Sequence, residues 1–333
     1  MDRISLFAST SLFQECRHTQ PSLPLAVAYC CNISAAFVLS LYILVPYRVR
    51  QLDRDDPLQI KWRSVATAIV CLFAILVYPI CFCAQDAADI KDDREQNQPV
   101  LERMGFSILR VPFKNHFGPL LHSMVLYMGP IALIVLQAKL MSESTQKDSN
   151  PATFMEALHA VLFPAPQCNS TKEQQMANRW SVLRARVIAP IFEEVAFRAC
   201  MVPVLAATGR FHRWTIPWVA PIFFGLAHCH HAALKLHQGE RLSQVVMTTA
   251  FQFAYTTLFG AYAAHAFMRS RSVVGVILSH SFCNTMGLPS FYFLNKSAPM
   301  YTHKTRLMQL HFLGVAIFVS GFFTEAFIPL QST

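Results

Sequence analysis

The sequence has little charge and little glycine for its length. Only 14% of its 333 residues are Asp, Glu, Lys or Arg, and glycine occurs 11 times. Soluble domains carry about 25% charged residues, so the composition argues against a soluble globular chain. Long uninterrupted apolar runs replace the alternating pattern that strands of a membrane barrel require.

Signatures of several enzyme classes are also missing. The chain has no HExxH motif and no His-Glu dipeptide, which disfavours the zincin proteases. It has neither a GxSxG nor a GxGD motif, which disfavours serine and aspartyl intramembrane proteases. One histidine cluster, HCHH at 228–231, is too few for a membrane di-iron oxygenase, which needs several.

What the chain does contain is apolar side chains. Hydrophobic residues make up 53% of the sequence, phenylalanine occurs 27 times, and the mean hydropathy is +0.34. The bilayer is therefore the expected solvent, and helices are the natural elements to span it. We predict an all-α, polytopic integral membrane bundle of about eight transmembrane helices.

The apolar segments give the approximate positions of these helices. The eight predicted spans are 25–46, 64–84, 119–140, 187–207, 216–231, 245–268, 273–294 and 307–330. Residues 85–117 are too charged to cross hydrocarbon and are expected to lie outside the membrane. Residues 154–163 are apolar but too short to span, which predicts an interfacial or re-entrant helix.

The predicted organisation is a single membrane domain, 1–333. We expect residues 1–150 to form scaffold helices and a polar loop. The later apolar segments contain ionisable residues in their middles, so we expect residues 151–333 to form the catalytic helices. The net charge of +9 comes from basic residues that flank apolar runs, such as Arg48, Arg50 and Arg54, and this placement indicates membrane topology rather than nucleic-acid binding. Most of the ten cysteines lie in apolar stretches, so we expect buried free thiols rather than a disulfide framework.

The segment 184–205, RARVIAPIFEEVAFRACMVPVL, places three charges within an apolar span. Each charge costs on the order of 3 kcal/mol at the bilayer centre, so these residues need a compensating role. Glu194 and Arg198 are four residues apart and share a helix face, which predicts an ion pair. Glu193 points roughly 100° away around the axis and is free to face another partner.

Two further segments carry polar groups within apolar helices. FFGLAHCHH at 223–231 places Phe224 and His228 on one helix face, and ILSHSFCNTMG at 277–287 does the same for His280 and Asn284. A carboxylate, two imidazoles and an amide in one cavity are suited to peptide hydrolysis by an activated water. The low dielectric inside a bundle makes a carboxylate a better base and strengthens the donors that bind an oxyanion.

Simpler roles compete with catalysis for several of these residues. A buried pair such as Glu194 and Arg198 is often architectural, and we expect Arg198 to fix Glu194 in place. His265 and His311 are predicted to be satisfied core groups. A transporter or scaffold would also explain intramembrane charges without chemistry, and a zinc protease could use Glu193, His228 and His280 as ligands.

Three motifs in this order resemble those of the type 2 CAAX prenyl endopeptidases, which they share with the wider bacterial CPBP family of glutamate intramembrane proteases. They are EEVAFR at 193–198, FGLAH at 224–228 and HSFCN at 280–284. The flanking sequence is similar to the eukaryotic prenyl-protease branch. The resemblance covers about residues 184–290.

The resemblance implies an activity, a set of site residues and a location. The implied site is Glu193, Glu194, Arg198, His228, His280 and Asn284. Glu193 and His228 would activate water, His280 and Asn284 would form the oxyanion hole, and the remaining pair would support them. The implied substrates are farnesylated or geranylgeranylated CaaX proteins such as small GTPases, cleaved after the modified cysteine at the endoplasmic reticulum membrane. No cofactor is expected, with zinc as the open alternative.

Overall fold

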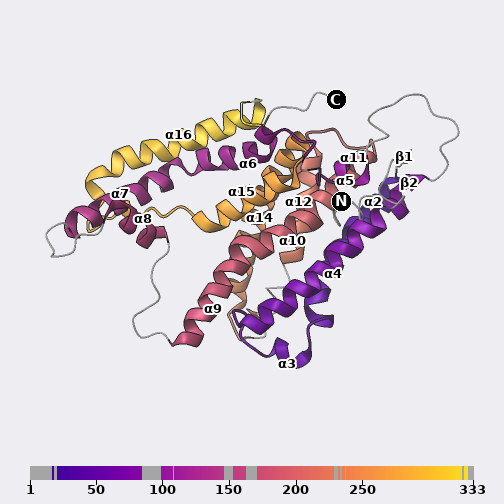
Figure 1. Cartoon of the computed structure of the whole chain (residues 1–333), viewed down its shortest axis with the longest axis horizontal. Coiled ribbons are helices and arrows are strands. Elements are labelled where there is room, and N and C mark those ends of the chain that lie inside the picture. The colour runs from indigo at the N-terminus through magenta and orange to yellow at the C-terminus, as the bar shows by residue number, and fades with distance from the viewer. Residues whose placement is uncertain are drawn as a thin grey trace, which may run out of the picture.

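The computed structural model describes residues 17–18, 21–84, 99–107, 109–145, 153–162, 171–228, 232, 235–236, 238–324 and 326–328. These residues are mainly helical (Figure 1). The exception is one antiparallel pair of two-residue strands, β1 (Arg17–His18) and β2 (Cys83–Ala84). The predicted all-α polytopic architecture is confirmed.

Three helical segments are long and apolar enough to cross a membrane. They are α2 (Leu23–Ile43), α4 (Pro57–Phe82) and Tyr301–Phe323, which contains α16 (Lys304–Phe323). The Ser22 hydroxyl accepts a hydrogen bond from the Leu25 N–H and so caps the start of α2. The first and last predicted spans therefore correspond to long helices, and the second begins seven residues earlier than predicted.

The predicted third span is instead a pair of helices with a sharp bend. The axes of α6 (Phe113–Leu126) and α7 (Met128–Thr145) differ by 71°. Pro130 lies in the first turn of α7, where a missing N–H is tolerated. A Cβ on Gly129 would overlap the imidazole of His311, so glycine allows α16 to pack against the bend. Counted as one span, this pair makes four long spans in the described part of the chain.

Shorter helices complete the bundle. They are α3 (Tyr47–Arg50), α5 (Val100–Arg103), α8 (Phe154–Leu162), α9 (Lys172–Leu183), α12 (Ile216–His228) and α15 (Val273–Met286). The short helix predicted at 154–163 is confirmed as α8. The polar helix α9 was not predicted, although Thr171 and Gln174 form the capping box that marks its start.

The segment that carries the two glutamates changes its winding twice. α10 (Ala189–Glu194) lies between two π-helical turns, η1 (Arg184–Ile188) and η2 (Val195–Cys200), and α11 (Met201–Ala207) follows. The Ala189 N–H donates to the Arg184 carbonyl, five residues back, rather than to Ala185. Pro190 has no N–H, so the backbone of this helix offers the Ala185 carbonyl no regular donor.

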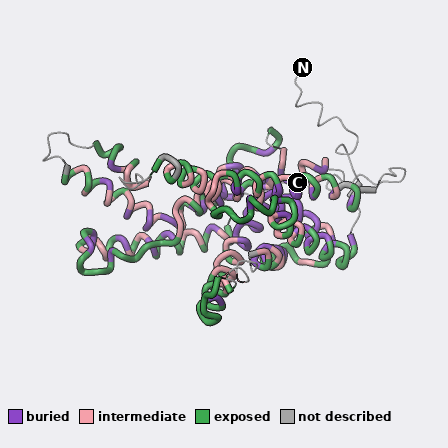
Figure 2. Tube along the Cα trace, turned by 90° about the horizontal axis from the view of Figure 1, so that it is seen from below, coloured by how far each residue is buried: buried purple, intermediate pink, exposed green. Residues whose placement is uncertain are grey.

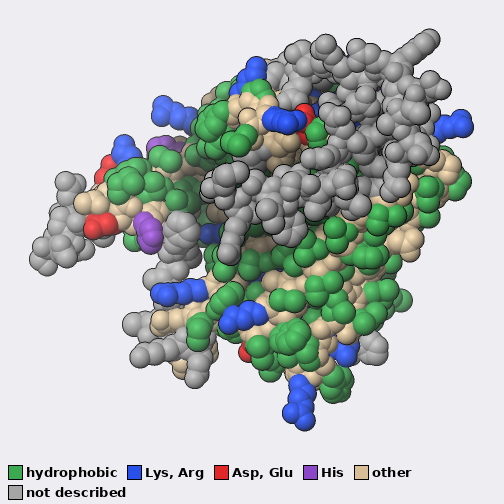
Figure 3. All heavy atoms as spheres, turned by 45° about the vertical axis from the view of Figure 1, so that its right-hand side comes forward, with side chains coloured by type: hydrophobic (Ala, Val, Ile, Leu, Met, Phe, Trp, Pro, Cys, Tyr) green, Lys and Arg blue, Asp and Glu red, His purple; other side chains and the backbone are tan. Residues whose placement is uncertain are grey.

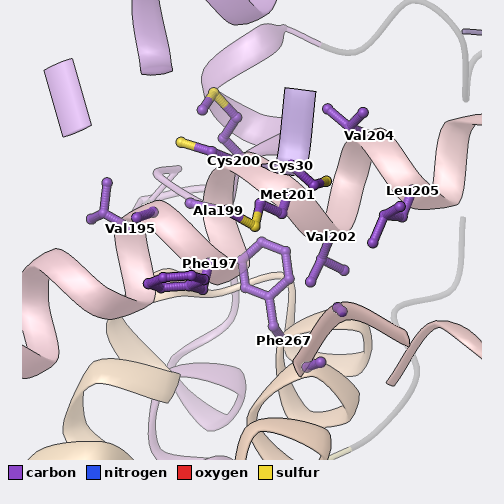
Figure 4. Packing of buried hydrophobic residues seen from close by; sticks show 14 of the residues in the cluster. Cys30, Val195, Phe197, Ala199, Cys200, Met201, Val202, Val204, Leu205 and Phe267 are labelled. Atoms are coloured by element: carbon purple, nitrogen blue, oxygen red, sulfur yellow. The ribbon is translucent and has the colours of Figure 1, made fainter. Parts of the chain in front are cut away.

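The main hydrophobic core surrounds this segment. α12, α15 and the long helix α14 (Leu242–Ser270) pack around it, and α2 and α4 cover another side. Figure 4 shows Phe197, Cys200 and Met201 of the segment close to Cys30 and Phe267. The buried residues concentrate in the middle of the molecule, whereas the projecting helices are largely exposed (Figure 2). The glutamate-bearing segment is thus packed against helices on several sides.

The outer surface is apolar over wide areas (Figure 3). On α4 exposed apolar side chains form a stripe at helical spacing, which includes Ile69, Leu72, Phe73, Leu76 and Ile80. An exposed apolar face of this size requires a nonpolar environment. Together with the long apolar helices, it identifies the chain as a membrane protein.

Candidate active site

Glu194 and Arg198 form the ion pair that their spacing predicts. Arg198 Nε lies 3.1 Å from Glu194 Oε2, and their side chains are 2% and 0% exposed. The guanidinium of Arg198 also lies 4.6 Å from the ring centroid of Phe224, a cation–π contact with the second motif. The two buried charges offset each other, and the aromatic ring adds to the stabilisation of the cation.

His280 on α15 is held by the same glutamate. Its Nδ1 lies 2.6 Å from Glu194 Oε1, and its ring centroid is 4.6 Å from that of Phe259 on α14. An ionised carboxylate can only accept hydrogen bonds, so Nδ1–H is the donor. Glu194 therefore sets both the orientation of the ring and the proton on Nδ1.

Glu193 approaches the other nitrogen of this imidazole. Its Oε2 lies 3.8 Å from His280 Nε2, and its side chain is 19% exposed, whereas Glu194 is fully buried. The sequence predicted that Glu193 would be free to face a different partner, but both carboxylates approach the same imidazole, one at each nitrogen. A water about 2.8 Å from both atoms would subtend an angle of about 85°, which one water can accommodate.

Asn284 lies one turn after His280 and has a backbone partner. Its Nδ2 donates to the Ala185 carbonyl at 2.9 Å. This is the carbonyl that the π-turn of η1 and Pro190 leave without a regular helical donor. The amide carries two N–H groups, so the second can still donate to a ligand. The geometry of η1 and Pro190, just before the first motif, therefore orients the amide of the third.

The second motif is only partly described. α12 ends at His228, but the side chain of His228 lies outside the described residues, as do Cys229, His230 and His231. Phe224, one turn before His228, is 2% exposed and packs against Phe197 and Arg198. α12 therefore brings the predicted motif next to the glutamate-bearing segment.

A cavity of about 1400 Å³ opens at these residues. Glu193, His280 and Asn284 line it, whereas the described positions of Glu194 and Arg198 place them behind this lining. Aromatic side chains cover much of the apolar part of the wall, namely Phe37, Phe192, Phe197, Phe224 and Phe259. The arrangement separates groups that can touch a substrate from groups that hold them in place.

Several side chains at the cavity were not singled out from the sequence. Phe259 had no distinguishing pattern within an apolar run. Arg54 and the other basic residues after the first predicted span, which include Arg63, were interpreted only as markers of topology, and Arg54 and Arg63 both line the cavity with Arg184. Their positive charge next to apolar spans was a visible signal, but sequence spacing alone does not show which of them turn inward.

Other polar and thiol groups have packing roles. His265 is 5% exposed and stacks on Phe322 at 3.9 Å, and His311 is 8% exposed and bonded to the Leu307 carbonyl, as expected for core histidines. Six cysteines are free thiols, namely Cys30, Cys31, Cys71, Cys81, Cys200 and Cys283. Four of them are buried, whereas Cys31 and Cys81 are exposed, which corrects the expectation of uniformly buried thiols.

Known proteins show similarity over most of the chain. The family model described as type II CAAX prenyl endopeptidase Rce1-like matches residues 175–286, which include all three motifs. CAAX prenyl protease 2 of Homo sapiens is 30% identical over 296 residues, covering 88% of this chain and 79% of the relative. No solved structure shows a significant match.

Two further relatives come from distant organisms. Probable CAAX prenyl protease 2 of Schizosaccharomyces pombe is 29% identical, over 78% of this chain and 79% of the relative. CAAX prenyl protease 2 of Arabidopsis thaliana is 28% identical, over 81% of this chain and 82% of the relative. The similarity extends over most of this chain and of its relatives, and the family model covers the buried Glu194, Arg198 and His280. The chain therefore belongs to the type II CAAX prenyl endopeptidase family.

Proposed function

We propose that this protein is an endopeptidase that removes the C-terminal aaX tripeptide from prenylated CaaX proteins by a glutamate-activated water. The observation that carries the mechanism is the position of Glu193, 3.8 Å from His280 Nε2 at the wall of a 1400 Å³ cavity. The relatives named as CAAX prenyl proteases support the substrate class. Its substrates are farnesylated or geranylgeranylated proteins such as small GTPases, at the endoplasmic reticulum membrane.

In the proposed reaction, Glu193 removes a proton from water, with His228 orienting that water. The hydroxide attacks the carbonyl carbon of the prenylated cysteine, and Glu193 then gives the proton it took from water to the leaving nitrogen as the C–N bond to the next residue breaks. General acid–base help of this kind contributes about 10²- to 10⁴-fold to the rate. The aromatic wall of the cavity offers the apolar surroundings that a prenyl chain requires.

His280 and Asn284 are proposed to bind the oxyanion. Because His280 gives Nδ1–H to Glu194, it can donate from Nε2 only as the imidazolium. The negative charge of Glu194 stabilises that form, and Arg198 fixes Glu194. In the tetrahedral intermediate, the oxyanion and the oxygen that came from water are bonded to the same carbon. Glu193, which acts on the water, and His280, which binds the oxyanion, must therefore lie close together, as they do.

The experiment that tests the function uses purified protein in bilayer nanodiscs and a farnesylated CaaX peptide. Release of the aaX tripeptide is measured with and without a metal chelator, and the same peptide without the prenyl group is the control. We expect cleavage of the prenylated peptide alone, at a rate that the chelator leaves unchanged. A rate that the chelator abolishes and added zinc restores would contradict the glutamate mechanism and favour Glu193, His228 and His280 as zinc ligands.

Replacement of Asn284 separates turnover from binding. Asn284→Ala is expected to lower kcat by about 10²-fold while KM changes less than about threefold, because an oxyanion donor acts mainly in the transition state. Steady-state kinetics on the prenylated peptide provides the measurement. Thr285→Val is a matched control on the same helix, since its hydroxyl donates to the Ser281 carbonyl one turn earlier. A rise in KM with unchanged kcat would assign Asn284 to substrate binding instead.

A further inference from the structure

The cavity wall carries more positive than negative charge. Its lining includes five basic side chains, Arg50, Arg54, Arg63, Arg184 and Lys235. It includes three acidic ones, Asp53, Glu193 and Glu240. The excess positive charge makes the cavity a favourable place for an anion.

Three of the arginines lie within electrostatic range of one another. Arg184 and Arg54 interact, and both act on Arg63. Arg184 has an acidic partner, with its Nη2 2.7 Å from Asp55 Oδ1. Within the described regions, Arg54 and Arg63 make no ion pair, and Arg63 has only a long hydrogen bond of 3.4 Å to the Gln59 amide oxygen. Two neighbouring guanidinium groups therefore line the cavity without an ion-paired carboxylate in the described regions, and Asp55 and Glu193 attract Arg54 only at longer range.

Comparison with the other arginines emphasises this feature. Arg198 is paired with Glu194, Arg110 with Glu102, and Arg269 donates to the Ile328 carbonyl. Guanidinium groups that repel one another at a partly enclosed site are disfavoured unless an anion joins them. Their planar fork of N–H groups matches a carboxylate, which it can bind with two parallel hydrogen bonds.

The substrate proposed above has one fixed anion near the scissile bond. Hydrolysis after the prenylated cysteine leaves three residues on the leaving side, and the last of them ends in a free carboxylate. Three extended residues span about 10 Å. Arg54, Arg63 and Glu193 line the same cavity, and Arg54 lies within electrostatic range of Glu193, so one bound tripeptide can extend from the proposed water site toward Arg54.

We propose that Arg54 and Arg63 bind the C-terminal carboxylate of the substrate and thereby select chains that end three residues after the prenylated cysteine. This inference rests on the proposed function. Arg184, held by Asp55, adds positive charge nearby without serving as a direct ligand. An additional residue would shift the carboxylate by about 3.3 Å and remove it from the fork.

The test compares two farnesylated CaaX peptides that differ only at the C-terminus, one a free acid and the other a carboxamide. For the wild type we expect kcat/KM to be about 10- to 100-fold higher for the acid, as for charge-assisted hydrogen bonds. In Arg54→Gln/Arg63→Gln this ratio should fall to near one, through loss of activity on the acid alone. Arg54→Lys and Arg63→Lys should retain part of the preference.

The carboxamide peptide is the internal control for folding and for catalysis. Lys61→Gln removes the same charge from an exposed position on α4 outside the cavity lining and should keep the wild-type ratio. If the double variant loses activity on both peptides, the single variants Arg54→Gln and Arg63→Gln are tested instead. If both keep the wild-type ratio of kcat/KM for the acid and the carboxamide, the proposal is overturned. Equal cleavage of the two peptides by the wild type also overturns the proposal. It is likewise overturned if the acid-to-carboxamide ratio of kcat/KM changes with the content of anionic lipid in the nanodisc but not with replacement of the arginines.

This outcome is distinguishable from failure of the proposed function. If the wild type cleaves neither peptide, the endopeptidase assignment fails and the carboxylate subsite fails with it. If the wild type cleaves both peptides with equal kcat/KM, the endopeptidase assignment stands and only the subsite is rejected.

Discussion

Glu193→Gln is expected to lower kcat for the prenylated peptide by about 10²- to 10⁴-fold, the contribution of a positioned general base. Glutamine keeps the size of the side chain but cannot accept a proton from water. Binding of the peptide should be retained, because the aromatic wall and the basic side chains of the cavity are unchanged. Single-turnover measurement of aaX release, together with equilibrium binding of the fluorescent peptide, separates the two effects.

Glu240→Gln is the matched control for this variant, because Glu240 lines the same cavity and the substitution removes the same charge. It should retain wild-type turnover. Glu193 is partly exposed, so its replacement should leave the unfolding transition in place. A Glu193→Gln protein that keeps more than about a tenth of the wild-type kcat would show that another group activates the water.

Arg198→Met should produce the largest loss of stability. Removing one partner of a buried ion pair leaves an uncompensated charge, here on Glu194, and typically costs about 3–5 kcal/mol. The contact of the guanidinium with Phe224 is lost as well. The free energy of unfolding, measured by denaturant titration in mixed micelles with tryptophan fluorescence, should fall by that amount. Activity should fall with it, because Glu194 no longer holds His280 in a fixed position.

The double variant Glu194→Gln/Arg198→Met distinguishes structure from positioning. It removes both buried charges, so most of the lost stability should return. Catalysis should not return, because a neutral amide cannot stabilise the imidazolium of His280. We expect kcat to remain at least about tenfold below the wild type with KM within about threefold. Full recovery of kcat would restrict the pair to an architectural role.

The sequence predicts the parts of this molecule that depend on local pattern. Hydropathy predicts α2, α4 and α16, because each is a continuous apolar run. The i to i+4 spacing predicts the pair of Glu194 and Arg198, because both lie in one helical segment. Hydropathy does not predict the bend between α6 and α7, because the residues on both sides of Tyr127 are equally apolar. That bend is supported by a tertiary contact between Gly129 and His311. These two residues are far apart in the sequence, so a pattern of neighbouring residues cannot reveal the contact.

The sequence predicts which residues belong to the site better than it predicts how their side chains are arranged. The three motifs indicate which side chains gather, but not that Glu193 and Glu194 approach opposite nitrogens of His280. That arrangement depends on how α15 packs against α10, a matter of tertiary geometry. The π-turns on either side of α10 alter the phase of the helix, and a 3.6-residue wheel cannot reproduce this change. The side chain of His228 lies outside the described residues, so its part in the site remains a prediction.

Pro190 makes one segment of the chain dependent on another that is almost a hundred positions away in sequence. Because proline has no N–H, the Ala185 carbonyl is left for the Asn284 carboxamide of α15 to bind. This hydrogen bond restricts the rotation of the Asn284 side chain before substrate arrives. The reaction then does not need to spend free energy on ordering this donor. An imino acid with no chemistry of its own thus helps to prepare the surroundings for the transition state.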